Sequence, residues 1–184
     1  ELTRDSQIMV LTSHARKIPE LGTALVVRDD AVSLLSLEGE LIETQSLYDL
    51  LSTAPAPYRF RTGTAPFWEQ YMPGRRPFRF QMMGSDQAKG QTVDLLHANA
   101  VRPLVFESVQ RTGPLYDPGN VLVTIRHQDT IAIFNWPTHK LLWAWGPGIL
   151  EGPHDATWLE NGNILVFDNG LERGWSRVVE IDPI

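Results

Sequence analysis

The sequence contains no cysteine, which excludes disulfides, thiolate nucleophiles and cysteine-ligated zinc or iron–sulfur sites. It contains no run of 18 apolar residues, so no segment is long enough to cross a membrane as a helix. Its 16 Lys and Arg are outnumbered by 22 Asp and Glu, and the formal charge of −6 provides no overall attraction to nucleic acid or anionic membranes. With 184 residues, 42% of them apolar, one globular domain is expected.

Helix signals are also scarce. Residues 46–51 predict one short helix, with Ser46 as N-cap and Asp49 three residues further on. Short apolar or alternating runs, bounded by Gly, Asn, Asp or Pro, predict β-strands in most of the remaining chain. These runs are 8–11, 24–27, 31–37, 41–44, 121–125, 131–134, 141–145, 164–167 and 178–181. Hairpin turns are expected at 28–30, 38–39 and 161–162.

The sequence contains an internal repeat. Residues 5–12 align with 118–125 and with 161–168, and further short strands follow each of these anchors. Four antiparallel strands per about 40–45 residues are the period of a β-propeller blade. We therefore expect an all-β, propeller-like fold with about three blades, in residues 1–53, 94–147 and 148–184, the last incomplete. A β-sandwich with coincidental internal similarity is the alternative.

Three blades do not close a ring, because closed propellers have four to eight. We therefore expect missing blades or protein partners to cover the two open faces. The chain starts at Glu1 with no leader pattern, so we expect either a leader that was removed or an internal piece of a longer protein, and the incomplete ring favours the second.

Residues 54–93 do not fit the repeat and are interpreted as an irregular insertion between blades. Five arginines alternate there with aromatic residues (Arg59, Arg61, Arg75, Arg76 and Arg79 with Tyr58, Phe60, Phe78 and Phe80). Stacking of these arginines on their own aromatic neighbours is the favoured interpretation. Docking to an acidic partner or to anionic headgroups, and binding of single-stranded nucleic acid, are the alternatives. On balance no nucleic-acid partner is predicted.

Two of the five histidines, His97 and His154, stand at the head of a strand that precedes a blade anchor. In a propeller this strand is the innermost, so its first residues face the central channel. With Asn99 and Arg126 they would form a cationic, donor-rich site suited to an oxyanion such as sulfate or phosphate. Such a site also suits group transfer, with one imidazole as nucleophile. A structural role for each histidine is the alternative, and no metal or other cofactor is predicted.

Four stretches of the chain resemble the bacterial arylsulfotransferases that do not use the nucleotide sulfate donor. They are His97–Asn99, Ile125–Gln128 followed by Ile131, Gly152–His154, and Val166–Gly170 with Arg173-Gly174 and Ser176-Arg177. The last string is the most specific. The resemblance covers residues 94–184, whereas 1–53 match only as a generic blade.

The resemblance implies a six-bladed propeller, exported to the periplasm, that moves a sulfuryl group from a phenolic sulfate donor to a phenol acceptor by a ping-pong route without a cofactor. It implies that His154 becomes transiently sulfated. It also implies that His97, Asn99 and Arg126 hold the sulfuryl oxygens and polarise the phenolic oxygen, and His127 is included beside them as a substrate-binding residue. A whole enzyme of this family has about twice as many blades, and the spacing from Arg126 to His154 is short for the family.

The alternative function is a non-catalytic, propeller-derived subunit that acts as a structural or docking module in a larger complex. Its contact with a membrane would run only through a partner or through residues 58–80.

Overall fold

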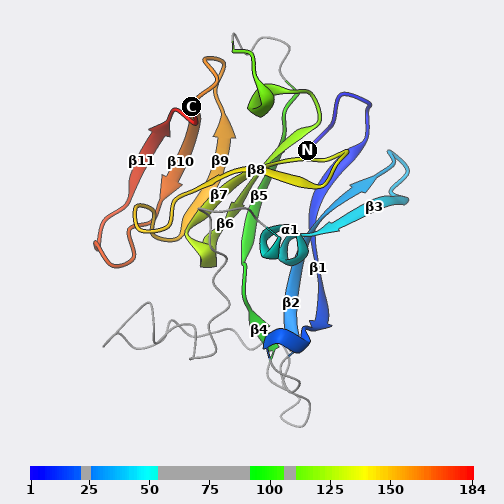
Figure 1. Ribbon diagram of the computed structural model, residues 1–184, viewed down its shortest axis with the longest axis horizontal. Helices are drawn as coiled ribbons and strands as arrows, with labels where there is room; N and C mark the ends of the chain where they lie inside the picture. Colours follow the sequence, from blue (N-terminus) through cyan, green and yellow to red (C-terminus); the bar gives the residue numbers. More distant parts are fainter. Residues whose placement is uncertain (22–25, 54–91, 106–110) are drawn as a thin grey trace.

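The computed structural model describes residues 1–21, 26–53, 92–105 and 111–184, and most of their regular structure is β-strand. Three β-sheets lie in a row, here named sheets A, B and C in chain order (Figure 1). The all-β prediction is confirmed. In this described part, no helix is long and apolar enough to span a bilayer.

Sheet A contains β1 (Ile8–Lys17), β2 (Val26–Leu35), β3 (Leu41–Ser46) and β4 (Thr92–Asp94). The first three are antiparallel neighbours, while β4 pairs in parallel with the start of β2. Residues 92–94 therefore belong to a sheet rather than to the expected insertion, whose remaining residues, 54–91, lie outside the described residues. The predicted helix is confirmed as α1 (Leu47–Ser52), with the Ser46 side chain accepting a hydrogen bond from the Asp49 amide.

The turn expected at 28–30 is wrong, because β2 runs through these residues without interruption. Asp29 is fully buried there and accepts hydrogen bonds at 2.9 Å from Arg16 and Ser46. Asp30 is also buried and accepts from Arg28 at 3.0 Å and from the Ala98 amide at 2.7 Å. Burial raises the pKa of Asp30, and the Arg28 hydrogen bond opposes this. Two adjacent carboxylates can therefore occupy a buried strand, because each has charged or polar partners.

Sheets B and C are antiparallel meanders. Sheet B has the strand order β5 (Ala98–Pro103), β6 (Asn120–Ile125), β7 (Thr130–Asn135) and β8 (Lys140–Trp145). Sheet C has the order β9 (Pro153–Trp158), β10 (Ile164–Asp168) and β11 (Arg177–Ile181). The strands predicted between 121 and 181 lie within these elements, and the predicted strands headed by His97 and His154 are β5 and β9.

Two hydrophobic cores join the three sheets. One lies between sheets A and B and includes Met9, Val32, Val123 and Phe134, together with residues of α1. The other lies between sheets B and C and includes Leu122, Ile133, Ala156, Trp158 and Val166. Each sheet therefore packs its apolar side chains against the next sheet along the chain.

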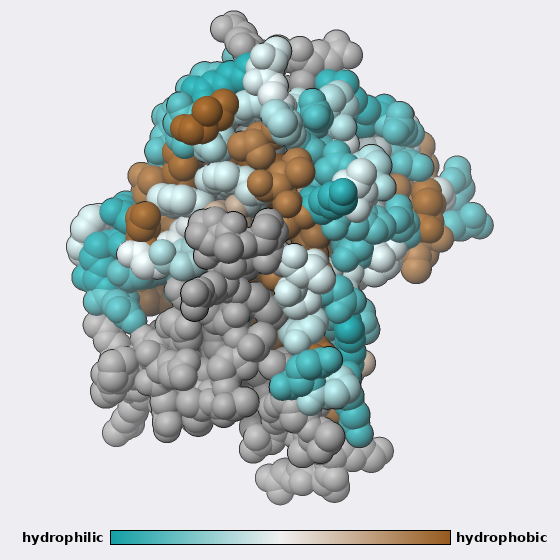
Figure 2. Space-filling model, in the orientation of Figure 1, coloured by the Kyte–Doolittle hydropathy of each residue, from teal (hydrophilic) through white to brown (hydrophobic). Residues whose placement is uncertain are grey.

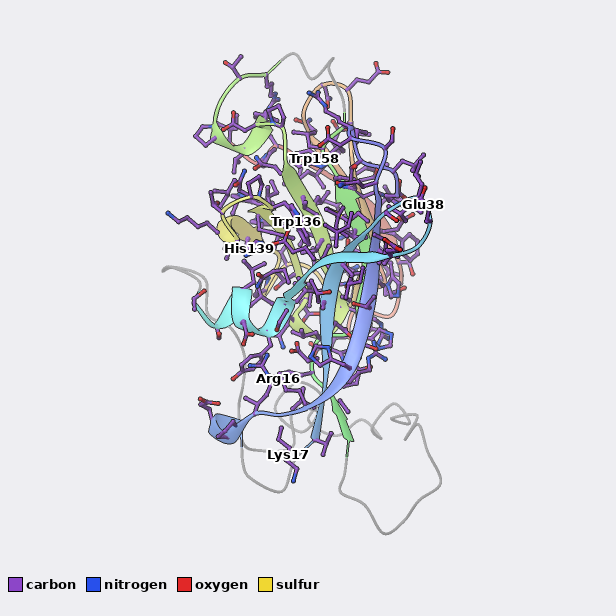
Figure 3. The ribbon with its side chains drawn as sticks, turned by 90° about the vertical axis from the view of Figure 1, so that its right-hand side faces the viewer. Arg16, Lys17, Glu38, Trp136, His139 and Trp158 are labelled. Carbon is purple, nitrogen blue, oxygen red and sulfur yellow. The ribbon has the colours of Figure 1, made fainter. Side chains whose placement is uncertain are left out.

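Polar contacts also join neighbouring sheets and elements. His139, in the β7–β8 turn, pairs with Glu43 of β3 through atoms 2.8 Å apart. Figure 3 shows His139 beside Trp136 and Glu38 in the β2–β3 turn. Arg16 lies below α1 in the same view and pairs with Asp49 of this helix at 2.8 Å. The predicted turns at 38–39 and 161–162 are confirmed. Sheet A lacks the innermost strand of a four-stranded blade among the described residues, and these residues do not form a closed ring.

Candidate functional site

We call His97, Arg126, His127 and His154 the histidine site. The 3-10 turn η3 (Arg126–Gln128) follows β6 and folds back on the start of β5. The Arg126 amide donates to the His97 carbonyl at 3.3 Å, and the His127 amide donates to the Leu96 carbonyl at 2.9 Å. Backbone hydrogen bonds thus place Arg126 beside His97, although the two residues are distant in the sequence.

His97 is held by Asp94, a residue that the sequence analysis missed. The Asp94 carboxylate accepts from the His97 backbone amide at 3.0 Å and contacts His97 Nδ1 at 2.6 Å. Burial favours a higher pKa for Asp94, but the hydrogen bond from His97 and the charges of His127, His97 and Arg28 outweigh it, so that the pKa is lowered. An ionised carboxylate can only accept, so Nδ1 of His97 carries a proton. An acid three residues before the histidine was the only sequence signal for this pairing.

His127 lies between Asp94 and Arg126. Its Nδ1 donates to the Asp94 carbonyl at 2.8 Å, and its Nε2 accepts from Arg126 Nη1 at 3.0 Å. Burial is the largest cause that lowers the pKa of His127 to about 4, so the ring is neutral at pH 7. Because both ring nitrogens are engaged within the protein, we interpret His127 as a residue that positions Arg126 rather than as a direct substrate ligand.

Asp94, His97 and His127 also meet the distance requirement for three ligands of one metal ion. Two ligands of one zinc ion, each about 2.0–2.1 Å from the metal, are roughly 3.3 Å apart in a tetrahedral site. The Asp94 Oδ2–His97 Nδ1 separation of 2.6 Å is instead that of a short hydrogen bond. Arg28 also lies 3.3 Å from the same carboxylate. These contacts fit a hydrogen-bonded relay better than a metal centre.

His154 has neutral partners at Nδ1. Its Nδ1 lies 3.1 Å from the Gly152 carbonyl, and in the tautomer that donates to this carbonyl Nε2 carries the lone pair. Asn169 Nδ2 donates to Gly152 at 2.7 Å and lies 2.9 Å from the same Nδ1, so its second N–H can donate to Nδ1 in the other tautomer. Burial and then the charges of Arg126 and His97 lower the pKa of His154. His154 is therefore a neutral imidazole near Arg126 and His97.

Asn99 connects sheets B and C on both sides of His154. Its Nδ2 donates to the Pro153 carbonyl at 2.9 Å, and its Oδ1 accepts from the Asp155 amide at 3.3 Å. Asn99 is predicted to bind substrate, and in the structure these two hydrogen bonds align β9 with β5.

The family-like string around Val166–Arg177 forms a buried ion cluster. Asp168 is fully buried and accepts from the Glu151 amide at 2.8 Å, Arg177 at 2.9 Å and Arg173 at 3.0 Å. Burial opposes ionisation of Asp168, but these three hydrogen bonds lower its pKa. Gly170 has φ +64°, and an added Cβ would lie 2.0 Å from the Trp175 carbonyl oxygen. The string therefore shapes the loop that contains Gly152 and leads into β9, where His154 lies.

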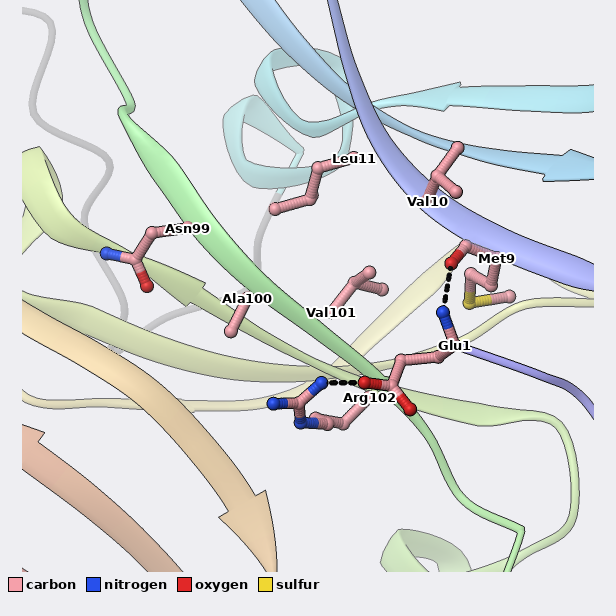
Figure 4. Close-up of a pocket in the computed structure, with 8 residues that line it drawn as sticks. All are labelled: Glu1, Met9, Val10, Leu11, Asn99, Ala100, Val101 and Arg102. Carbon is pink, nitrogen blue, oxygen red and sulfur yellow. Dashed lines mark hydrogen bonds and ion pairs between the residues drawn. The ribbon is translucent and has the colours of Figure 1, made fainter.

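An open groove adjoins the histidine site through Asn99. It lies between β1 and β5, and its apolar lining includes Met9, Leu11 and Val101 (Figure 4). Glu1 and Arg102 also line it and form an ion pair. Asn99 therefore contacts β9 and also borders a hollow that has both polar and apolar walls.

Comparisons with family models, with curated proteins and with solved structures find no match to the chain. The resemblance to arylsulfotransferases therefore rests on the four sequence stretches alone and stays a prediction.

Proposed function

We propose that the chain is part of an arylsulfotransferase-like β-propeller that transfers a sulfuryl group between phenols through His154. The observation that carries this proposal is the state of the His154 ring. Its lowered pKa leaves the ring neutral, and in the tautomer whose Nδ1 donates to Gly152 the Nε2 lone pair is available beside Arg126 and His97. A neutral imidazole next to cationic donors is what nucleophilic attack on a sulfate ester requires.

In the first half-reaction, His154 Nε2 attacks the sulfur of an aryl sulfate. The N–S bond forms and the bond from sulfur to the phenolic oxygen breaks. The leaving phenolate takes a proton from protonated His97, whose imidazolium is stabilised by the Asp94 carboxylate 2.6 Å from Nδ1. Arg126 stabilises negative charge on the sulfuryl oxygens, and His127 holds Arg126 in place.

In the second half-reaction, an acceptor phenol attacks the sulfur of sulfated His154. The bond from sulfur to oxygen forms, the N–S bond breaks, and His97 takes the phenolic proton. His97 is therefore protonated again and His154 is neutral again, so the cycle needs no cofactor. This order of steps gives ping-pong kinetics.

A propeller arrangement is supported by the packing of the sheets. Sheets A, B and C follow each other along the chain, and each packs on the next through a hydrophobic core. We include in the proposal the six-bladed ring and the periplasmic location that the resemblance implies. Fractionation of cells that express the natural gene tests the location.

Intact-mass measurement at neutral pH after brief exposure to 4-nitrophenyl sulfate tests the mechanism. We expect the chain to gain one SO3 group and His154→Ala to gain none. His139→Gln, which changes a histidine in the β7–β8 turn, is the matched control and should gain the group normally. An unmodified wild-type chain, or an unchanged adduct in His154→Ala, contradicts the proposal.

A non-catalytic docking function is the second candidate, and the exposed face of sheet C favours it. Phe167 and Val178 have 42% and 61% of their surface exposed on neighbouring strands. Under this function the chain binds its protein partners equally well when His154 is replaced, which a pull-down from the natural host with both proteins would measure.

A further inference from the structure

The outer face of sheet C carries an exposed apolar patch at positions that are buried in the other sheets. We define the C face as Leu165, Phe167, Val178 and Glu180, which form two cross-strand pairs between β10 and β11. Phe167 and Val178 are its exposed apolar members.

Sheet B shows what covers these positions. In the repeat, Leu165 and Phe167 align with Leu122 and Thr124. Their cross-strand partners in sheet B are Ile133 and Ile131, and all four residues of sheet B are fully buried. Sheet C covers them, and its Ala156 amide donates to Thr124 Oγ1 at 3.0 Å.

Sheet A repeats the arrangement. Met9 and Leu11 occupy the same positions of the repeat, and they pair with Leu34 and Val32. These side chains lie in the core that sheet A shares with sheet B. The same four positions thus form the contact with the next sheet twice, and the C face is their third occurrence.

Sheet A exposes the other half of this contact, which is the face that in sheet B packs against the preceding sheet. In sheet B, Val121, Phe134 and Leu141 pack against sheet A. Their counterparts by register are Ile8, Leu35 and Leu41, which we call the A face. Ile8 and Leu35 are half-buried, and Leu41 is 64% exposed. One chain therefore presents both halves of the contact that joins its own sheets.

Hydrophobic surface is visible at both ends of the row of sheets. Figure 2 shows brown patches on the side of β9–β11 and again at the β3 end. These patches are formed by side chains at the molecular surface.

We propose that a second copy of this chain covers the C face with its A face, and that the two copies thereby close a ring of six sheets. The contact is heterologous, since different faces meet, and a two-fold rotation closes it after two copies. Six sheets fall within the four to eight that closed propellers contain. The inference uses the propeller arrangement proposed above but not the sulfuryl transfer.

Light scattering coupled to size-exclusion chromatography tests the two-copy ring. The wild-type chain should have twice the monomer mass of 20.8 kDa. Val178→Lys should have the monomer mass, because a buried unpaired charge in each of the two contacts opposes association. Ile149→Lys is the matched control, since Ile149 is 49% exposed but lies in the loop before β9, outside both faces, and it should remain a dimer.

Mixing two monomeric variants tests the head-to-tail geometry. Leu41→Lys changes the A face and should also give monomers. A mixture of Val178→Lys and Leu41→Lys should recover dimers, because one of the two contacts in the mixed pair then has two wild-type faces. A face-to-face dimer of two C faces would not recover in this way.

Circular dichroism of each variant shows that the sheets are intact. A monomeric wild-type chain, an oligomer other than a dimer, a dimer unaffected by Val178→Lys, or failure of the mixture to recover overturns the proposal. Each of these results is independent of the SO3 adduct, so the failure of this inference and the failure of the proposed transfer chemistry can be told apart.

Discussion

His97 lies one residue before β5 and His154 is the second residue of β9, and their Nδ1 atoms have different partners. His97 faces the Asp94 carboxylate at 2.6 Å, whereas His154 faces the Gly152 carbonyl at 3.1 Å. A carboxylate stabilises a protonated imidazole, and a neutral carbonyl near cationic groups does not. In the mechanism proposed above, this difference in the partner of Nδ1 is the reason for giving proton transfer to His97 and nucleophilic attack to His154.

The largest expected effect on stability comes from a change beside the loop that leads to His154. Asp168→Ala removes the carboxylate that binds Arg173 and Arg177. Loss of one partner from a buried ion cluster costs about 3–5 kcal/mol of the free energy of unfolding. Urea unfolding followed by circular dichroism measures this.

Asp182→Ala is the control, because Asp182 pairs with Arg111 at the surface. Its unfolding curve should match that of the wild type. Equal curves for Asp168→Ala and the wild type would contradict the structural role given to the family-like string.

The His97 side predicts a loss of stability in mild acid. The pKa of His127 is lowered from 6.5 to about 4 in the folded chain, so the unfolded chain binds more protons between these pH values. The contribution of neutral His127 to the free energy of unfolding is therefore fully present above about pH 6.5 and falls by about 3 kcal/mol as the pH approaches 4. The free energy of unfolding, measured across this range, should show the decrease.

His127→Gln should reduce this pH dependence, because glutamine does not titrate. His154, whose pKa is also lowered, keeps its own contribution in the same direction, and Asp30, whose pKa is raised, acts in the opposite direction. The carboxylates Asp94 and Asp168, whose pKa values are lowered, lose their own contribution at still lower pH. A variant with the same pH dependence as the wild type would show that another group is responsible.

A smaller effect is expected when the partner of His97 is made neutral, as that of His154 already is. Asp94→Asn should slow transfer to a phenol acceptor roughly 100-fold, since proton transfer by a positioned group contributes at least this much. Formation of the SO3 adduct from 4-nitrophenyl sulfate, whose leaving group needs no proton, should be almost unchanged. Stopped-flow and steady-state kinetics separate the two steps.

The pH profile distinguishes proton transfer from a merely structural role of Asp94. Transfer by Asp94→Asn should have a changed pH dependence, while adduct formation should keep the wild-type profile. Asp155→Asn alters an exposed carboxylate next to His154 and should change neither step. Equal slowing of both steps in Asp94→Asn would remove the distinction between the two histidines.

The smallest effect is expected for Asn99, which connects sheets B and C. Asn99→Ala removes hydrogen bonds to Pro153 and Asp155 and should lower the free energy of unfolding by about 1–2 kcal/mol. Asn161→Ala, which loses only exposed contacts, with Glu180 and with the Asn163 amide, is the control and should be destabilised less. Thermal unfolding of both variants measures the difference.

Much of the fold could be predicted from the sequence because its signals are local. Alternating apolar runs indicated the strands of sheets B and C, Ser46 indicated the start of α1, and the repeated anchors showed that β6 and β10 are equivalent. The same repeat placed His97 and His154 at the heads of strands. These predictions depend on periodicity and turn residues within a few positions of each other.

The tertiary structure alone decided the partners of the charged groups. Asp29 and Asp30 suggested a turn, but partners such as Arg16 and Ala98 allow them to lie in a buried strand. Asp94 reaches the site only because β4 pairs with β2, and because η3 folds back to place His127 against it. The roles of Asn99, Asp94 and His127 depend on such contacts between distant segments, since the free energy of a buried charge depends on what surrounds it and not on its neighbours in the sequence.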